Sequence, residues 1–237
     1  MLKLESVTVR FGGLTAVNSV SLEVPAAGIL GLVGPNGAGK TTLFNSISGL
    51  VKAQSGAIRF AGNDISRWPQ HRRARAGLGR TFQIPQPLAQ LSVRENLIVA
   101  QRFGAGAVDE KRLDEILALV GLHAKAAADA ATALSLSELK ALEVAKALAT
   151  NPQLLLLDEV LAGMESEGKR AFRAMLQKVH EQLRVALLII EHDIETISAL
   201  CPRVVVLNFG EVIADGAPDQ VFRDPRVMES YTGQVAA

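Results

Sequence analysis

The sequence predicts an α/β fold with a largely parallel core sheet, an antiparallel β layer and an inserted helical subdomain. Short apolar runs of strand length alternate with helical segments along much of the chain, a pattern typical of parallel sheets. A glycine-rich loop over residues 34–42 stands between an apolar strand and a helix-like run. From Ser92 to Ala149 the apolar spacing is helical, so this stretch interrupts the series of strands.

Length and charge bound the class of protein. With 237 residues, 49% of them hydrophobic, the chain can bury a substantial core as one large α/β domain or a domain with a modest insertion. A net charge of +1 lacks the basic excess expected of a nucleic-acid-binding protein. The single cysteine, Cys201, lies in an apolar segment, which indicates a buried thiol in a reducing, intracellular compartment. No stretch resembles a signal peptide or the ~18-residue apolar run of a membrane span.

The first 83 residues contain the antiparallel layer. Strands are predicted over residues 4–10, 17–24, 57–60 and 78–83, and turns over 11–13 and 62–64. A short helix is predicted over residues 66–76 and ends at Gly77. Its arginines (Arg72, Arg73 and Arg75) could form a nucleic-acid patch, but the cluster is short and Trp68 is its one aromatic neighbour. A solvated helical face is therefore favoured.

The helical part begins and ends at recognisable caps. Ser92 and Glu95 have the spacing of a capping box, which predicts a helix through residue 99 or beyond. A second helix is predicted over residues 111–120. Ser135 and Glu138 repeat the capping-box spacing before a helix that runs to Ala149. We interpret residues 84–134 as a helical subdomain inserted into a single domain whose core comprises residues 1–83 and 135–237.

The C-terminal third returns to alternating strands and helices. Strands are predicted over residues 154–158 and 185–190, and a hairpin over 204–207 and 211–214. Between the first two strands, residues 165–183 form an amphipathic helix with an apolar stripe (Phe172, Met175, Leu176, Val179 and Leu183), which indicates core packing. Short helices are predicted over residues 218–231.

The loop matches the phosphate-binding pattern G-x-x-x-x-G-K-[ST] without a gap. Its residues are Gly34, Pro35, Asn36, Gly37, Ala38, Gly39, Lys40, Thr41 and Thr42. Glycines let backbone N–H groups approach a polyphosphate closely, and the helix that follows adds its positive end. We expect Lys40 to reach the β- and γ-phosphates and the Thr41 hydroxyl to bind Mg²⁺. An ordinary glycine turn with a chance lysine is the alternative, but the flanking strand and helix favour binding of a nucleoside triphosphate.

Polar residues follow two other predicted strands. Asp158 and Glu159 end the leucine strand, and His192 follows the strand over residues 185–190. Ligands of open α/β sheets lie beyond the carboxyl ends of the strands, so we expect these groups to share a crevice with the loop. Asp158 would hold Mg²⁺ through water or through Thr41, and Glu159 would orient the attacking water. Two solvent-facing acids and a structural histidine are the alternatives.

The chain resembles an ABC-transporter ATPase subunit over nearly its whole length. The resemblance implies an α/β P-loop NTPase core, with residues 34–41 as the Walker A loop and 154–158 as the Walker B strand. It implies ATP and Mg²⁺ as ligands, with Asp158, Thr41 and the Q-loop residue Gln83 at the metal. Glu159, His192 and Gln83 would be catalytic. Phe11 and Val17 would contact the base, and residues 162–165 occupy the D-loop position.

The resemblance also implies that two subunits enclose two ATP molecules, each site being completed by the partner's L-S-G-G-Q segment. Here that segment is Leu134-Ser135-Leu136-Ser137-Glu138, which lacks both glycines. Ser135 can still serve a γ-phosphate across the dimer. Ser137 still supplies a backbone N–H, but we expect its side chain to crowd the close approach that glycine allows. Glu138 would bring negative charge near the phosphate unless it turns away. We therefore expect a weakened composite site and a heterodimer in preference to a homodimer.

Three segments resemble the branched-chain amino-acid uptake group: residues 10–17, 79–83 and 208–216. That group implies an importer on the cytoplasmic face of the membrane with two ATPases, two permeases and an external solute-binding protein. The permease would bind near residues 82–88. Three alternatives stay open: the ATPase of a lipopolysaccharide or lipid exporter, a soluble ABC ATPase acting on nucleic acid, and a phosphotransferase. The absence of a second ATPase unit, a heptad array or an acceptor-binding segment weighs against the last two.

Overall fold

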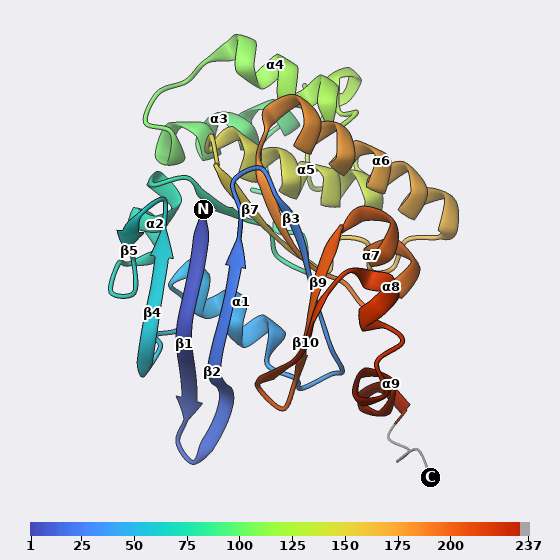
Figure 1. The fold of residues 1–237 in the computed structure, drawn as a ribbon. Coiled ribbons are helices and arrows are strands. Elements are labelled where there is room, and N and C mark those ends of the chain that lie inside the picture. Colours follow the sequence, from blue (N-terminus) through green and yellow to red (C-terminus); the bar gives the residue numbers. More distant parts are fainter. Residues whose placement is uncertain (233–237) are drawn as a thin grey trace. The chain divides into compact units, whose positions relative to one another are not determined.

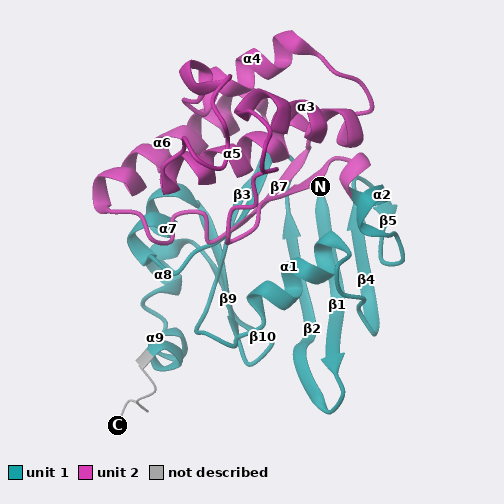
Figure 2. Cartoon of the chain, turned by 180° about the vertical axis from the view of Figure 1, so that it is seen from behind, with its two compact units in different colours: residues 1–73, 186–237 teal, residues 74–185 magenta. Residues whose placement is uncertain are grey.

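The structure is a computed structural model that describes residues 1–232. The chain forms two compact units, one of residues 1–73 and 186–237 and the other of residues 74–185, shown in teal and magenta in Figure 2. Within residues 1–232, no helix combines the length and the apolar character needed to span a bilayer.

The first unit contains the predicted antiparallel layer. Its strands pair in the order β2-β1-β4-β5, all antiparallel (Figure 1). They are β1 (Leu2–Phe11), β2 (Leu14–Val24), β4 (Ser55–Phe60) and β5 (Asn63–Asp64). The predicted strands are thus confirmed with longer bounds, and the expected turn over residues 62–64 contains the short strand β5.

A β-bulge explains why the apolar alternation in β1 is imperfect. Leu2 and Leu4 are buried, but the next buried apolar residue is Val7. The register with β2 shifts between Leu4 and Val7, where Ser6 has a φ of 48° and donates its N–H to the Ser21 hydroxyl at 2.9 Å. A bulge adds one residue to one strand, so the side chains after Ser6 exchange faces.

The same unit holds the strand that precedes the phosphate loop. β3 (Ile29–Val33) is parallel to both β8 (Ala186–Ile190) and β9 (Arg203–Asn208), while β10 (Glu211–Gly216) pairs antiparallel with β9. All five residues of β8 are buried, as a strand in a parallel sheet requires. The predicted strand and hairpin are confirmed. The helices of this unit are α1 (Lys40–Ser48), α7 (Ile194–Leu200), α8 (Pro218–Val221) and α9 (Pro225–Thr232). Helix α2 (Gln70–Arg75) begins in this unit, and its last two residues belong to the second unit.

Helix α7 is absent from the sequence-based prediction. Asp193 caps it, because its carboxylate accepts the N–H groups of Glu195 and Thr196 at 3.1 and 3.3 Å. Ile197 and Leu200 are its buried apolar residues. An N-cap aspartate followed by apolar residues three apart is the local signal that could have predicted it.

The predicted solvated arginine face on α2 is wrong for Arg73. This side chain is 2% exposed, and its guanidinium donates to the carbonyls of Ser46 and Ile47 at the end of α1, both at 2.7 Å. Guanidinium donors satisfy the open carbonyls of a helix C-terminus, where the macrodipole also favours a cation. Arg72 instead stacks on Trp68, 3.9 Å from the ring centre. The cluster therefore contains a structural cation.

The second unit consists of a pair of parallel strands and a group of helices. β6 (Leu78–Arg80) pairs with β7 (Leu154–Asp158), and β6 is shorter than the predicted 78–83. The helices are α3 (Val93–Gly104), α4 (Glu110–Leu119), η1 (His123–Lys125), α5 (Leu136–Ala149) and α6 (Ser166–Leu183). Both predicted capping boxes are confirmed. Helices α3, α4 and η1 fall within residues 84–134, whose role as a separate inserted subdomain stays a prediction.

Candidate functional site

At two positions of the phosphate loop, neighbouring main-chain atoms leave space for glycine only. Gly34 and Gly39 have φ values of 144° and 101°, and Gly39 is the N-cap of α1. A Cβ on Gly34 would lie 2.1 Å from the Leu207 carbonyl oxygen, and one on Gly39 would lie 2.3 Å from the Ala16 carbonyl oxygen. Side chains are excluded at both positions, so the loop keeps the close backbone curve that a polyphosphate needs.

Lys40 folds back over the loop that precedes it. The side chain is 5% exposed, and its ammonium donates to the carbonyls of Gly34 and Pro35 at 2.7 and 2.9 Å. The loop therefore holds a buried positive charge at the N-terminus of a nine-residue helix. Helix N-termini and ammonium groups both favour bound anions, which makes this segment suitable for phosphate.

The tip of the β9–β10 hairpin supports the loop, a contact that sequence reasoning missed. The Gly210 N–H donates to the Ala38 carbonyl at 3.0 Å, and the Asn18 N–H donates to the Gly210 carbonyl at 2.8 Å. The hairpin thereby joins the loop to β2. Its neighbour Phe209 is 87% exposed. The sequence signal was the turn at Phe209-Gly210, but nothing local indicated what the turn would contact.

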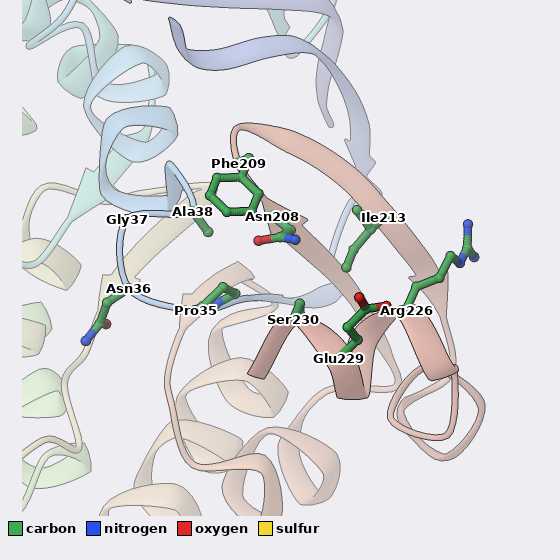
Figure 3. Close-up of a pocket in the computed structure, with 10 residues that line it drawn as sticks. All are labelled: Pro35, Asn36, Gly37, Ala38, Asn208, Phe209, Ile213, Arg226, Glu229 and Ser230. Carbon is green, nitrogen blue, oxygen red and sulfur yellow. The ribbon is translucent and has the colours of Figure 1, made fainter. Parts of the chain in front are cut away.

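An open cavity of about 620 Å³ lies between the loop, the hairpin and α9. Figure 3 shows Pro35 and Ala38 directed toward it and Asn36 directed away. Arg226, Glu229 and Ser230 line it from the side of α9. Burial raises the pKa of the neighbouring Tyr231 phenol, while a hydrogen bond from the Gly34 N–H acts in the opposite direction. Residues of α9 and of the phosphate loop therefore line the same cavity.

The other predicted site residues of this unit differ in accessibility. Phe11 ends β1 and is 50% exposed, whereas Val17 is fully buried in β2. Thr41 is exposed in the first turn of α1, and His192 is exposed between β8 and α7. Their roles at a nucleotide stay predictions, and so does the convergence of the loop with the carboxylates that follow β7.

In the second unit, the structure brings Gln83 and Glu159 together. The Gln83 amide nitrogen donates to the Glu159 carboxylate at 2.6 Å. Glu159 has a φ of 49°, a left-handed conformation that is rare for a residue with a side chain. The predicted catalytic pair, 76 residues apart in sequence, is thus in direct contact.

Asp158, the predicted metal ligand, forms a buried ion pair that the sequence did not reveal. Its carboxylate lies 3.1 Å from an Arg80 guanidinium nitrogen, and the two side chains are 5% and 8% exposed. Burial lowers the pKa of Arg80, and the charge of Asp158 opposes that shift. Arginine keeps its charge in proteins, so a fixed cation faces the Asp158 carboxylate.

Glu138 in the altered signature segment turns into its own helix. Its carboxylate accepts the Ser135 N–H at 2.8 Å and the Lys125 ammonium at 2.8 Å. These contacts lower the pKa of Glu138, the bond from Lys125 contributing most. The negative charge of Glu138 is thus paired with Lys125. The remaining difference from the L-S-G-G-Q pattern is the bulk of the side chains at the two glycine positions, which are Leu136, 48% exposed, and Ser137.

Comparisons with known proteins agree across the chain. A family model described as "ABC transporter" matches residues 17–162, and one described as "Branched-chain amino acid ATP-binding cassette transporter" matches residues 211–237. The branched-chain amino acid transport ATP-binding protein BraF of Pseudomonas aeruginosa is 36% identical, covering 99% of this chain and 98% of the relative. LivG of Escherichia coli, similarly described, is 32% identical over 99% of this chain and 98% of the relative. The ADP conformation of an ATP-binding cassette of an ABC transporter superposes with a TM-score of 0.89 at 29% identity, covering 99% of both chains.

We predict that Arg80→Met will lower the free energy of unfolding by about 3–5 kcal/mol, because it removes a buried cation that lies 3.1 Å from the buried Asp158 carboxylate. Urea unfolding of the full-length protein measures this change. The control is Arg203→Met, which removes a bidentate partner of Asp215 at two contacts of 2.6 Å in a pair that is 40% and 34% exposed. The control should cost about 1 kcal/mol or less. Equal losses in the two variants would contradict the burial argument.

Proposed function

Because the chain belongs to the ABC transporter ATP-binding family, we propose that it is the ATPase subunit of an importer for branched-chain or other amino acids. The relatives with this description align with nearly the whole chain, and the match over residues 211–237 supports the same group. Members of the family bind ATP. The observation that carries the assignment to this chain is the glycine-lined loop with its buried Lys40.

The nucleotide would be held through the phosphate loop. Backbone N–H groups of residues 36–42 and the Lys40 ammonium would bind the phosphates, and Phe11 would stack on the base. The chemistry of the donors fits Mg²⁺: Thr41, Gln83 and Asp158 offer hydroxyl, amide and carboxylate oxygens, and Mg²⁺ bound to phosphates needs only one or two protein carboxylates. When bound, the ion would neutralise charge on the β- and γ-phosphates.

Glu159 would act as the general base. Its ionised carboxylate accepts hydrogen bonds only, and the bond from Gln83 at 2.6 Å orients one oxygen. The other oxygen can accept a proton from water attacking the γ-phosphate. His192 would donate a hydrogen bond to that phosphate. Gln83 thus links the base to the segment over residues 82–88, where we place the permease.

Two such subunits would close over two ATP molecules and open after hydrolysis. Ser135 is the N-cap of the fourteen-residue helix α5, so it can present a hydroxyl and a helix N-terminus to the partner's γ-phosphate. Leu136 and Ser137 would crowd that approach. A partner subunit with an intact glycine pair would complete the nucleotide site of this chain, which favours a heterodimer.

The permease would bind the apolar residues that follow β6. Phe82, Ile84 and Leu88 are 38%, 74% and 39% exposed within seven residues, and neighbouring exposed apolar side chains mark interaction sites. The subunit would lie at the cytoplasmic face of the membrane through this contact. The external solute-binding protein would act on it only through the permease.

Two substitutions test the ATPase assignment. Lys40→Ala should weaken ATP binding by tenfold or more, because a charge-assisted contact is worth ~1.5–3 kcal/mol. Glu159→Gln should keep binding, lower kcat by about 10²–10⁴ and accumulate a closed dimer. ATP titration, turnover assays and size-exclusion chromatography measure these effects. Glu181→Gln, on the exposed face of α6, is the control. Normal turnover by Glu159→Gln would refute the base assignment.

The signature segment gives a second prediction. The double variant Leu136→Gly with Ser137→Gly should raise the ATPase activity of the purified subunit by about threefold to tenfold, equivalent to roughly 1 kcal/mol of barrier. Glu138→Gln should change activity less than twofold, since Lys125 already neutralises that charge. A gain from Glu138→Gln equal to that of the glycine variant would show that charge is the obstacle.

Permease binding gives a third prediction. Ile84→Asp should reduce co-purification with the membrane subunits at least tenfold while ATP affinity stays within twofold, because a buried carboxylate is costly at an apolar contact. Phe103→Asp provides a matched control, since Phe103 is 71% exposed in the same unit. Equal retention of the permease by both variants would rule out this docking segment.

A further inference from the structure

Lys140 is a buried lysine that contacts the residues around the proposed base. It lies in the second turn of α5 and is 4% exposed. Its ammonium donates to the Glu159 carbonyl at 3.2 Å and to the Ala162 carbonyl at 2.5 Å. Both acceptors belong to the turn that follows β7. Burying a cation is costly unless its N–H groups make hydrogen bonds. The two hydrogen bonds therefore help to offset the cost of burying the Lys140 ammonium.

The turn that Lys140 contacts has an unfavourable backbone conformation. Glu159 has a φ of 49°, and the left-handed region is sterically unfavourable for a residue with a Cβ. The Ala162 N–H donates to the Glu159 carbonyl at 3.2 Å, closing a four-residue turn. Lys140 adds a charged donor to that same carbonyl and to the carbonyl at the far end. The ammonium therefore stabilises both ends of a turn that would otherwise relax.

Glu159 is consequently held at two points. Gln83 binds its carboxylate at 2.6 Å, and Lys140 binds its main-chain carbonyl. The Glu159 side chain is attached to the backbone of this turn. A change in the backbone conformation of the turn would therefore move the carboxylate even if the hydrogen bond from Gln83 persisted. Placement errors of about 1 Å can reduce catalysis ~10²-fold, so the main-chain contact bears on turnover.

Helix α5 carries both Lys140 and the Ser135 cap. Ser135 precedes the first residue of the helix, and Lys140 lies five residues later. An α-helix rises only about 1.5 Å per residue, so it is stiff over the five residues that separate Ser135 from Lys140. A displacement of the signature end of α5 would therefore move the Lys140 ammonium with it. The helix connects the segment that serves the partner's nucleotide with the base of this subunit.

We propose that Lys140 is a positioning residue, which holds the turn at Glu159 and couples the orientation of the base to the position of the signature helix. The proposal rests on the role of Glu159 proposed above. It requires no contact between Lys140 and nucleotide. Loss of the ammonium should therefore affect the catalytic step and leave nucleotide affinity unchanged.

The test compares Lys140→Met and Lys140→Arg in the purified full-length protein. Lys140→Met keeps the length of the side chain and removes its donors, so kcat should fall about tenfold to a hundredfold while KM for ATP stays within twofold. Lys140→Arg restores a cation and should recover most of kcat. The matched control is Lys146→Met on the same helix, whose ammonium binds the Gln86 carbonyl at 2.6 Å and Glu143 at 2.7 Å. Its kcat should change less than twofold.

A double-variant cycle separates positioning from general damage. In the Glu159→Gln background, Lys140→Met should have less than a twofold further effect, because residues acting as a unit are non-additive. Three outcomes would overturn the proposal. They are an unchanged kcat in Lys140→Met, a change in its KM as large as the change in its kcat, and full additivity of Lys140→Met with Glu159→Gln. If Lys140→Met cannot be purified, Lys140→Gln is measured against the same criteria. Normal turnover by Glu159→Gln would instead overturn the base assignment itself, so the two failures are distinguishable.

Discussion

The first unit depends on one constraint, which is that main-chain carbonyls of neighbouring strands lie very close to the phosphate loop. Carbonyl oxygens of Leu207 and Ala16 stand 2.1 and 2.3 Å from the places where side chains of Gly34 and Gly39 would begin. The two carbonyls belong to β9 and β2. Gly210, at the tip of the β9–β10 hairpin, accepts a hydrogen bond from Asn18 of β2. The curve of the loop is therefore set by neighbouring strands before any nucleotide binds, which reduces the ordering that binding requires.

Buried charge is the corresponding constraint in the second unit. Around the end of β7, the buried Asp158 carboxylate faces Arg80 and the buried Lys140 ammonium donates to two carbonyls. A low local dielectric strengthens these two sets of contacts and makes their loss costly. The Glu159 carboxylate beside them accepts a hydrogen bond from the exposed Gln83 amide. The same network that stabilises the turn also orients the group we propose as the base, so structural and catalytic demands coincide there.

The altered signature segment shows how a departure from a family pattern can be accommodated locally. Glu138 serves as the third residue of a capping box and pairs with Lys125. Its negative charge thereby supports the start of α5, where the macrodipole favours an anion. What the segment retains is a capped helix N-terminus with the Ser135 hydroxyl. What it lacks is the open backbone that two glycines would supply, and this asymmetry underlies the proposed heterodimer.

The sequence by itself determined the features whose signals are local. The strand–loop–helix order at Gly34–Thr42, both capping boxes and the leucine strand follow from neighbouring residues, because backbone freedom, caps and apolar period act over a few positions. Tertiary structure alone decided the β-bulge at Ser6, the burial of Arg73 and the partners of Arg80 and Lys140. Arg80 and Asp158 are 78 residues apart in the chain, and the pairing of β6 with β7 brings them into contact. Their residue types indicated charge, whereas the identity of each partner depended on which strands and helices pack together.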